Sequence, residues 1–216
     1  MKKTVLPISD VYKKIKLGYT IEDVYIKELI ELRELATKDF IDFSITFDNC
    51  EIVAFDAGNI FFNKQITLRN CIIKSASFYA SYFLSGITIE NCEFKNNIFL
   101  MSCGGHNTID TQVIISNSLF NGYVDMFDAW FTGPVKITEC NFRKGTNLLG
   151  NKKKAWEIQF DTEPYIKNNI GKLDLNDNLF HWDKKPRILT RLISKKKGMN
   201  PLPGYKNKWD NENFMF

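Results

Sequence analysis

Three aspartates and one histidine are the residues of this chain whose types and spacing could support acid–base catalysis. His106 is followed by Asp110, Asp125 and Asp128. Two carboxyl groups about 5–10 Å apart around a groove are the arrangement that hydrolyses glycosidic bonds. The three aspartates therefore define one hypothesis, a carbohydrate-active enzyme.

The surroundings of these residues favour a different interpretation. The sequence contains no GxSxG, HExxH, P-loop or dinucleotide-binding motif. His106 and Asp110 lie in the segment MSCGGHNTIDTQ, residues 101–112, whose glycines and polar residues are typical of a loop. We therefore predict that the protein is not an enzyme, and the aspartates stay as the alternative.

The cysteines raise the question of a metal or redox site. Cys50, Cys71, Cys92 and Cys140 recur at one place in a repeated pattern, and the total of five is odd. Metal sites need ligands that converge on a point, whereas residues repeated along a chain form a line. We predict buried, reduced thiols that fill space, with no metal and no cofactor.

A repeat with a long and a short period organises the chain. A polar residue followed by a small one recurs at nearly regular intervals, in Asn49-Cys50, Asn70-Cys71, Asn91-Cys92, Asn117-Ser118 and Glu139-Cys140. Between these positions, apolar-x-apolar pairs follow in steps of five or six, among them Ile45/Phe47, Cys50/Ile52, Phe55/Ala57, Ile60/Phe62 and later Asn97/Phe99. Neither a helix nor a flat strand has a period of five.

A chain that turns two alternate residues inward, makes a corner and repeats this four times completes one square coil. Such coils stack about 4.8 Å apart through backbone hydrogen bonds, and each buries the inward face of its neighbour. We predict an all-β solenoid whose axial core consists of Phe47, Ile52, Leu68, Ile73, Phe78, Phe83, Ile89, Phe94, Phe99, Ile115, Phe120, Ile137 and Phe142. The recurrent asparagines would stand at corners, where Asn tolerates turn conformations.

Residues 45 to 149 resemble the bacterial pentapeptide-repeat proteins. The resemblance rests on large central residues such as Phe78 and on small residues two positions earlier, such as Ala76 and Ser81. It implies a right-handed quadrilateral β-helix with coils of roughly 21 residues, each coil being one repeat unit. We expect an N-terminal segment with a capping helix (1–39), the repeat β-helix (40–150), and a mixed C-terminal cap with irregular closing coils, a basic helix and an aromatic tail (151–216).

Both ends of the solenoid need cover, because an open strand edge invites aggregation. At the N-terminal end, Thr20 as N-cap and an apolar stripe of Ile21, Tyr25, Leu29, Leu32 and Ala36 predict a helix up to Lys38. At the other end, LDLNDNLF (173–180) repeats the pattern once more in outline. A basic amphipathic helix is expected over 187–197, and it serves either as a lid or for binding a partner or a membrane surface.

Charge and surface argue for binding. The net charge is only +4, with seven basic against eleven acidic residues in 39–150, so direct nucleic-acid binding is not expected. The lack of a secretion signal or an apolar run of about 18 residues predicts a cytoplasmic protein that is not inserted in a membrane. We expect a protein-binding module, either a scaffold or an immunity-type inhibitor, with a homodimer left open.

The candidate contact residues are polar positions of the rod, of the 101–112 insertion and of the basic helix: Asp48, Glu51, Glu90, Glu93, His106, Asp110, Arg187 and Arg191. If the acidic ones form one patch, reversing their charge should slow association at low salt. The resemblance also implies a second alternative, mimicry of DNA towards DNA gyrase, which needs a strongly acidic face along the rod.

Overall fold

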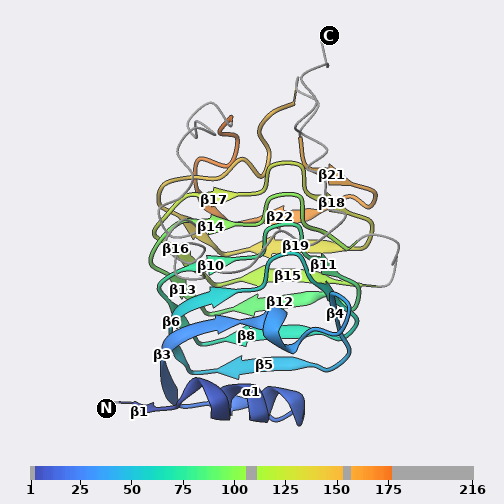
Figure 1. The fold of residues 1–216 in the computed structure, drawn as a ribbon. Helices are drawn as coiled ribbons and strands as arrows, with labels where there is room; N and C mark the ends of the chain where they lie inside the picture. The colour runs from blue at the N-terminus through green and yellow to red at the C-terminus, as the bar shows by residue number, and fades with distance from the viewer. Residues whose placement is uncertain (1–2, 106–110, 153–156, 177–216) are drawn as a thin grey trace, which may run out of the picture. The chain divides into compact units, whose positions relative to one another are not determined.

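The structure is a computed structural model that describes residues 3–105, 111–152 and 157–176. The candidates His106, Asp110, Arg187 and Arg191 lie outside these ranges, as do the predicted basic helix and the aromatic tail. The described residues form a parallel β-solenoid of about six turns, which confirms the predicted fold class (Figure 1).

One row of strands contains the most regular repeat of the chain. Its seven strands pair in parallel in the order β2 (Ile21–Glu22), β5 (Ile45–Asp48), β8 (Ile66–Arg69), β12 (Ile87–Glu90), β15 (Val113–Ser116), β19 (Val135–Thr138) and β22 (Tyr165–Lys167). Each of these strands ends directly before a corner residue with positive φ. Successive strands along this row therefore mark successive coils of the solenoid.

An eleven-stranded sheet covers the two rows that follow each corner. Next to β1 (Thr4–Val5), the long strands β3 (Val24–Glu31) and β6 (Glu51–Asp56) run through both rows. Beyond β6 the sheet divides. One branch contains β9 (Ile72–Ile73), β13 (Glu93–Phe94), β16 (Leu119–Phe120), β20 (Asn141–Phe142) and β23 (Ile170–Gly171), and the other contains β10 (Ala76–Ser77), β14 (Ile98–Phe99) and β17 (Val124–Asp125).

The fourth row closes each coil. It consists of β4 (Phe40–Ile41), β7 (Phe61–Phe62) and β11 (Tyr82–Phe83), followed by the pair β18 (Trp130–Phe131) and β21 (Gln159–Phe160). Gly104 joins the two groups, because it forms a parallel bridge to Tyr82 on one side and to Trp130 on the other. Four rows in each coil agree with the short period of the sequence, because each five- or six-residue step of the pattern forms one side of the square coil.

The corners explain the recurrent asparagines. Asn49, Asn70, Asn91 and Asn117 have φ between +48° and +54°, in the left-handed region that Asn enters more readily than most residues. Glu139 occupies the same corner with φ +57°. The side-chain amide of Asn70 also donates to Asp48 Oδ1 of the preceding coil at 2.7 Å. The corner asparagines thus stabilise both the turn and the stack.

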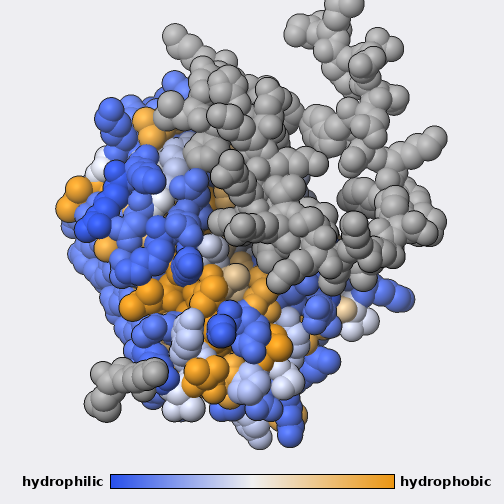
Figure 2. Space-filling model, turned by 60° about the vertical axis from the view of Figure 1, so that its left-hand side comes forward, coloured by the Kyte–Doolittle hydropathy of each residue, from blue (hydrophilic) through white to orange (hydrophobic). Residues whose placement is uncertain are grey.

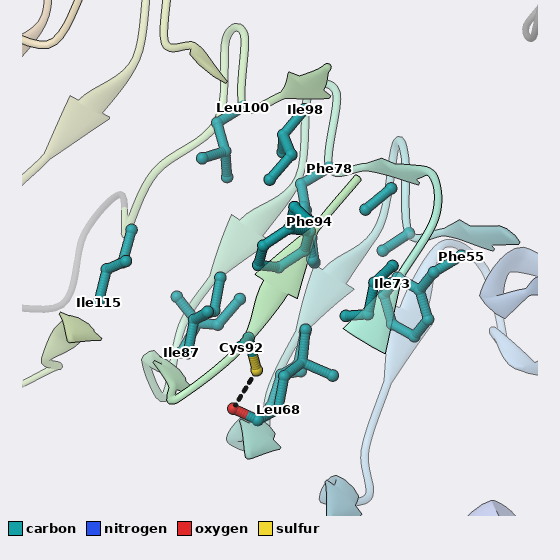
Figure 3. Packing of buried hydrophobic residues seen from close by; sticks show 14 of the residues in the cluster. Phe55, Leu68, Ile73, Phe78, Ile87, Cys92, Phe94, Ile98, Leu100 and Ile115 are labelled. Carbon is teal, nitrogen blue, oxygen red and sulfur yellow. Dashed lines mark hydrogen bonds between the residues drawn. The ribbon is translucent and has the colours of Figure 1, made fainter. Parts of the chain in front are cut away.

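The core lies along the axis, and Figure 3 shows its packing around Phe94. All residues predicted for the axial core are buried. Phe94, Phe120 and Phe142 stack with ring centroids 5.2 and 4.9 Å apart and planes within 8° of parallel. Each such side chain, fully removed from water, contributes about 1.5–3 kcal/mol of burial free energy.

The predicted inward pair Asn97/Phe99 is wrong by one residue. Ile98 pairs with Ala76 and Val124, and Ile98 and Leu100 belong to the core, whereas Phe99 lies in the outward register with Ser77 and Asp125. The chain gains one residue between Phe94 and Ile98, and a one-residue slip moves every side chain to the other face. Phe99 is buried, but it is not among the core residues.

The predicted helix over 20–38 is also wrong. Residues 21–31 form β2 and β3, a 3-10 helix covers η1 (Leu32–Leu35), and the α-helix lies earlier, at α1 (Ile8–Lys16). Asp23, with φ +58°, occupies the first corner, because Ile21 and Glu22 pair with Phe47 and Asp48. The inward residues of these strands are four or five positions apart, which is close to the spacing of one helix face. The apolar stripe in the sequence was therefore compatible with a helix as well as with strands. Val11 and Ile15 of α1 are buried in the core at this end, where the cap was expected.

Within the described residues, the repeat resumes earlier than expected after β19. Lys136 to Thr138 pair with Tyr165 to Lys167, and Asn141 pairs with Ile170. The repeat therefore resumes at 165–171, after the longest step along this row, and residues 177–180 of the predicted 173–180 repeat lie outside the described ranges. The sequence pattern did not identify this repeat, because its corner has the sequence Asn168-Asn169 and Gly171 replaces the large inward residue.

Candidate functional site

The repeated small residues form a ladder of donors to backbone carbonyls. Cys71 Sγ lies 3.0 Å from Arg69 O, and Cys92 Sγ lies 3.4 Å from Leu68 O (Figure 3). Ser118 donates to Ser116 O at 2.8 Å in the same way. Burial raises the pKa of the Cys140 thiol to about 11. These thiols fill space and bond locally, and the described residues contain no cluster of His, Cys, Asp and Glu that could hold a metal ion.

The two described aspartates of the enzyme hypothesis have separate surroundings. Asp125 is buried, and its Oδ1 accepts from the backbone N–H of Phe127 at 3.1 Å and from the amide of Asn147 at 2.9 Å. Asp128 is exposed at a corner with φ +56°, and its Oδ2 accepts from Ser102 at 3.2 Å. Asp125 thus takes part in a buried polar network, which is the usual role of such a carboxylate.

The four described acidic candidates line one corner of the rod, in two columns. Asp48 and Glu90 lie on the row of β5 and β12, with Arg69 between them in register. Glu51 and Glu93 lie on the next row, with Ile72 between them. The structure therefore brings the four residues to the same edge but interrupts both columns.

Basic side chains neutralise part of this corner. Arg69 lies 3.7 Å from Asp48 and 3.9 Å from Glu90, and Lys95 lies 2.5 Å from Glu93. The hydrogen bond from Lys95, with a further one from Asn121, holds the pKa of Glu93 below its usual range. The corner is a mosaic of both signs, and exposed pairs of this kind contribute little free energy.

An aromatic column on the fourth row was not predicted. Phe40, Phe61 and Tyr82 are in register, and their rings stack with centroids 4.9 and 4.6 Å apart. Trp130 continues the column beyond Gly104, and Phe40 and Trp130 are each 39% exposed. We call Phe40, Phe61, Tyr82 and Trp130 the aromatic column. Its signal was present in the sequence, because the first three residues are equally spaced, with the same period as the first corner asparagines.

The insertion around 101–112 changes the fourth row. Ile66 pairs with Ile87, and Ile87 pairs with Val113, so this coil is longer than the one before it, as predicted. Within the insertion, Cys103 is buried and Gly104 occupies the position where a column residue would stand. The insertion therefore places its glycine inside the aromatic column.

Apolar exposure is not confined to the column. Ile72 and Tyr79 are each 40% exposed on other parts of the rod. Figure 2 shows a side that is mostly hydrophilic, with apolar residues gathered toward the N-terminal end. Single exposed apolar residues are normal on protein surfaces. What distinguishes the aromatic column is the continuous stacking of its first three rings.

No protein-family model matches the chain, and no similar protein was found among curated proteins or solved structures. Within the described ranges, no helix has the length and apolar character needed to cross a bilayer. The fold that the described residues establish is a β-helix repeat protein with a spacing of about 22 residues from coil to coil.

Proposed function

We propose that this protein is a non-enzymatic protein-binding module, a scaffold or an immunity-type inhibitor, that contacts its partner with one face of a rigid β-helix. We assign it to the pentapeptide-repeat architecture, a right-handed quadrilateral β-helix. The short period of five, the four rows in each coil and the small residues before the large ones support this assignment.

The aromatic column is the observation that carries the proposal. Exposed aromatic side chains dominate the binding free energy of many protein interfaces, because they bury a large area and have few rotatable bonds. Here the rings of Phe61 and Tyr82 are also held against each other at 4.6 Å. A surface fixed in advance loses little conformational entropy on binding.

The two alternatives have weaker support. Mimicry of DNA requires continuous negative charge, and Arg69 and Lys95 interrupt the acidic corner. Catalysis by the aspartates requires two carboxylates facing one groove, whereas Asp125 is buried among structural hydrogen bonds. The acidic corner keeps a secondary role in our proposal, in steering the partner at low salt.

A capture experiment with matched variants tests the function. Tagged wild-type protein, Phe61→Thr and Ile72→Thr are incubated with a cell lysate at low and moderate salt, and bound proteins are identified with their stoichiometry. Thr retains strand propensity at both sites. Ile72 is the control because it is an exposed apolar residue on a different row.

We expect one stoichiometric partner that wild type and Ile72→Thr retain and Phe61→Thr loses. A partner that all three proteins retain equally would leave a binding module but reject the aromatic column as its contact. No stoichiometric partner at either salt would contradict the proposed function, and a panel of polysaccharides would then test the enzyme alternative.

A further inference from the structure

The helix at the N-terminal end of the solenoid carries exposed lysine and apolar side chains. Figure 1 shows α1 lying across this end of the coils. Val11 and Ile15 of α1 are buried against the core, so the opposite side of the helix faces away from it. Lys13 and Lys16 are exposed, and Leu17, the C-cap, is 57% exposed. Because residues three and four apart on a helix are neighbours, the last three side chains share one face.

The end of the helix places a fourth side chain beside them. Gly18, with φ +71°, ends α1 in the left-handed conformation, and the N–H of Tyr19 donates to Lys14 O at 3.0 Å. This is a common glycine C-cap, which holds the following residue against the last turn of the helix. Tyr19 is 60% exposed, and a Cβ atom on Gly18 would meet no described atom within 4 Å. We define the cap patch as Lys13, Lys16, Leu17 and Tyr19.

The cap patch carries positive charge. The helix contains Lys13, Lys14 and Lys16, and its one acidic residue is Asp10. None of the three lysines belongs to an ion pair among the described residues. Lysines in the last turn of a helix interact favourably with the helix dipole, so their charge alone has a structural explanation. The exposed Leu17 beside them has none of this kind.

The nearest acidic groups of the first coil approach the helix at a different place. The N–H of Glu31 donates to the hydroxyl of Tyr12 at 2.9 Å, and Tyr12 is partly buried against the core. Glu34 acts on the same hydroxyl through its charge. Both glutamates therefore approach α1 near Tyr12, whereas Leu17 and Tyr19 follow the last turn of the helix.

We infer that the cap patch docks the solenoid on the surface of an anionic phospholipid bilayer. Lysines are attracted to the lipid phosphates, while exposed apolar side chains such as Leu17 enter the interfacial region. Tyr19 suits the same depth, because its ring is apolar and its hydroxyl is polar. The contact is peripheral and reversible. The inference is independent of the protein-binding function, because the aromatic column lies along the coils and the cap patch lies at their end.

A protein or a nucleic acid fits the cap patch less well. Protein interfaces are enriched in arginine and depleted of lysine, and α1 contains three lysines and no arginine. The phosphates of a nucleic acid are bound by charge, which leaves Leu17 without a role. Both kinds of partner are outcomes of the experiment below.

Sedimentation of the full chain with lipid vesicles tests the inference. Vesicles of phosphatidylcholine alone are compared with vesicles that also contain about one quarter phosphatidylserine, at low and at high salt. The cap-patch variants are Lys13→Gln with Lys16→Gln, and Leu17→Thr. Circular dichroism checks that each variant keeps the fold of the wild type.

Matched variants elsewhere on the coils control for total charge and apolar surface. Lys74→Gln with Lys144→Gln removes two exposed lysines outside the cap patch, so it lowers the net charge by the same amount. Ile72→Thr removes an exposed apolar side chain from the second row.

We expect wild type to bind the anionic vesicles at low salt, to bind them less at high salt, and not to bind the neutral vesicles. Lys13→Gln with Lys16→Gln should weaken binding about 25-fold, because each lysine near an anionic surface contributes about fivefold. Leu17→Thr should weaken it at least about threefold, and the control variants should bind like wild type.

Three results would overturn the inference. They are no binding of wild type to anionic vesicles, binding that the cap-patch variants retain, and an equal loss in the two double lysine variants, which would indicate attraction by total charge. If vesicles are not bound, but a DNA duplex or a captured protein is bound by wild type and lost by Lys13→Gln with Lys16→Gln, the cap patch belongs to that kind of partner instead.

Discussion

The regular coils (residues 45–94) and the irregular coils (95–171) use equivalent positions differently. In the regular coils, Phe47, Leu68 and Ile89 are in register and equally spaced along the chain. In the irregular coils the spacing of the paired strands changes from one coil to the next. Gly104 stands there in line with Tyr82. The regular coils stack the rings of Phe61 and Tyr82, and the departure from the repeat interrupts this column at Gly104.

The largest expected effect is on the regular core. Phe94→Ala should lower the free energy of unfolding by about 3–5 kcal/mol, because it removes a buried aromatic ring from the stack with Phe120 and leaves a cavity. Urea denaturation followed by circular dichroism measures it. A loss below about 1 kcal/mol would mean that the inward register is wrong.

The second effect tests the close approach in the irregular coils. Gly104→Ala should cost about 1–3 kcal/mol, since the added Cβ would overlap the carbonyl oxygen of Trp130. Gly58→Ala is the matched control, because its Cβ would meet Asp56 Oδ1 and Tyr79 O at 3.2 and 3.3 Å. Equal losses of stability for both variants would refute a special role for Gly104.

The corners supply a third comparison. Asn70→Ala in a regular coil should destabilise by about 1 kcal/mol, because alanine enters the left-handed region less readily. Glu139→Asn in an irregular coil should instead stabilise by roughly 0.5 kcal/mol, because Glu139 has φ +57° at the same corner. Changes of the same sign in the two thermal denaturation experiments would contradict this account of the corners.

The smallest effect depends on pH. Burial, with the nearby Glu31, raises the pKa of Asp56, so the folded state binds its proton more tightly than the unfolded state. Stability contributed by this group is therefore present at low pH and is lost as pH rises through the raised pKa. Asp56→Asn, which keeps an oxygen acceptor for the Gly58 N–H, should gain less than about 1 kcal/mol at pH 7.

The same comparison at low pH is the control for Asp56. Below the ordinary aspartate pKa of about 4, both states of the wild type are protonated, so the advantage of Asp56→Asn should disappear. Urea titrations of both proteins at pH 7 and pH 3 measure this difference. An equal gain at both values would show that the carboxylate charge is not its cause.

The sequence predicts the regular coils better than the irregular ones. Phe47, Asn70 and Cys92 repeat with a period, so their inward or corner positions could be read from the sequence. Ile98 could not, because one added residue before it changed the register. The first coil could not be recognised in the sequence either. Its inward residues, Ile21, Ile26 and Ile30, are spaced as on one face of a helix, and they lie in strands because they pair with the next coil.

The proposed contact surface was harder to predict than the core. The acidic candidates Asp48 and Glu90 were chosen by charge, and the arginine between them became visible only through the register. The residues of the aromatic column had the right period, but exposed aromatic residues cannot be told from core residues by type. Trp130 and Gln159 are distant in the sequence and come into register only because the coil between them is long.

Affinity for the captured partner, measured at low and moderate salt, tests the central claim that the aromatic column is the contact surface. The proteins are wild type, Tyr82→Ala and Glu90→Lys. We predict that Tyr82→Ala raises the Kd about 30-fold at both salt concentrations, as for an interface residue worth about 2 kcal/mol, and that Glu90→Lys slows association only at low salt. An unchanged Kd for Tyr82→Ala together with a large loss for Glu90→Lys would place the contact on the acidic corner and contradict the account.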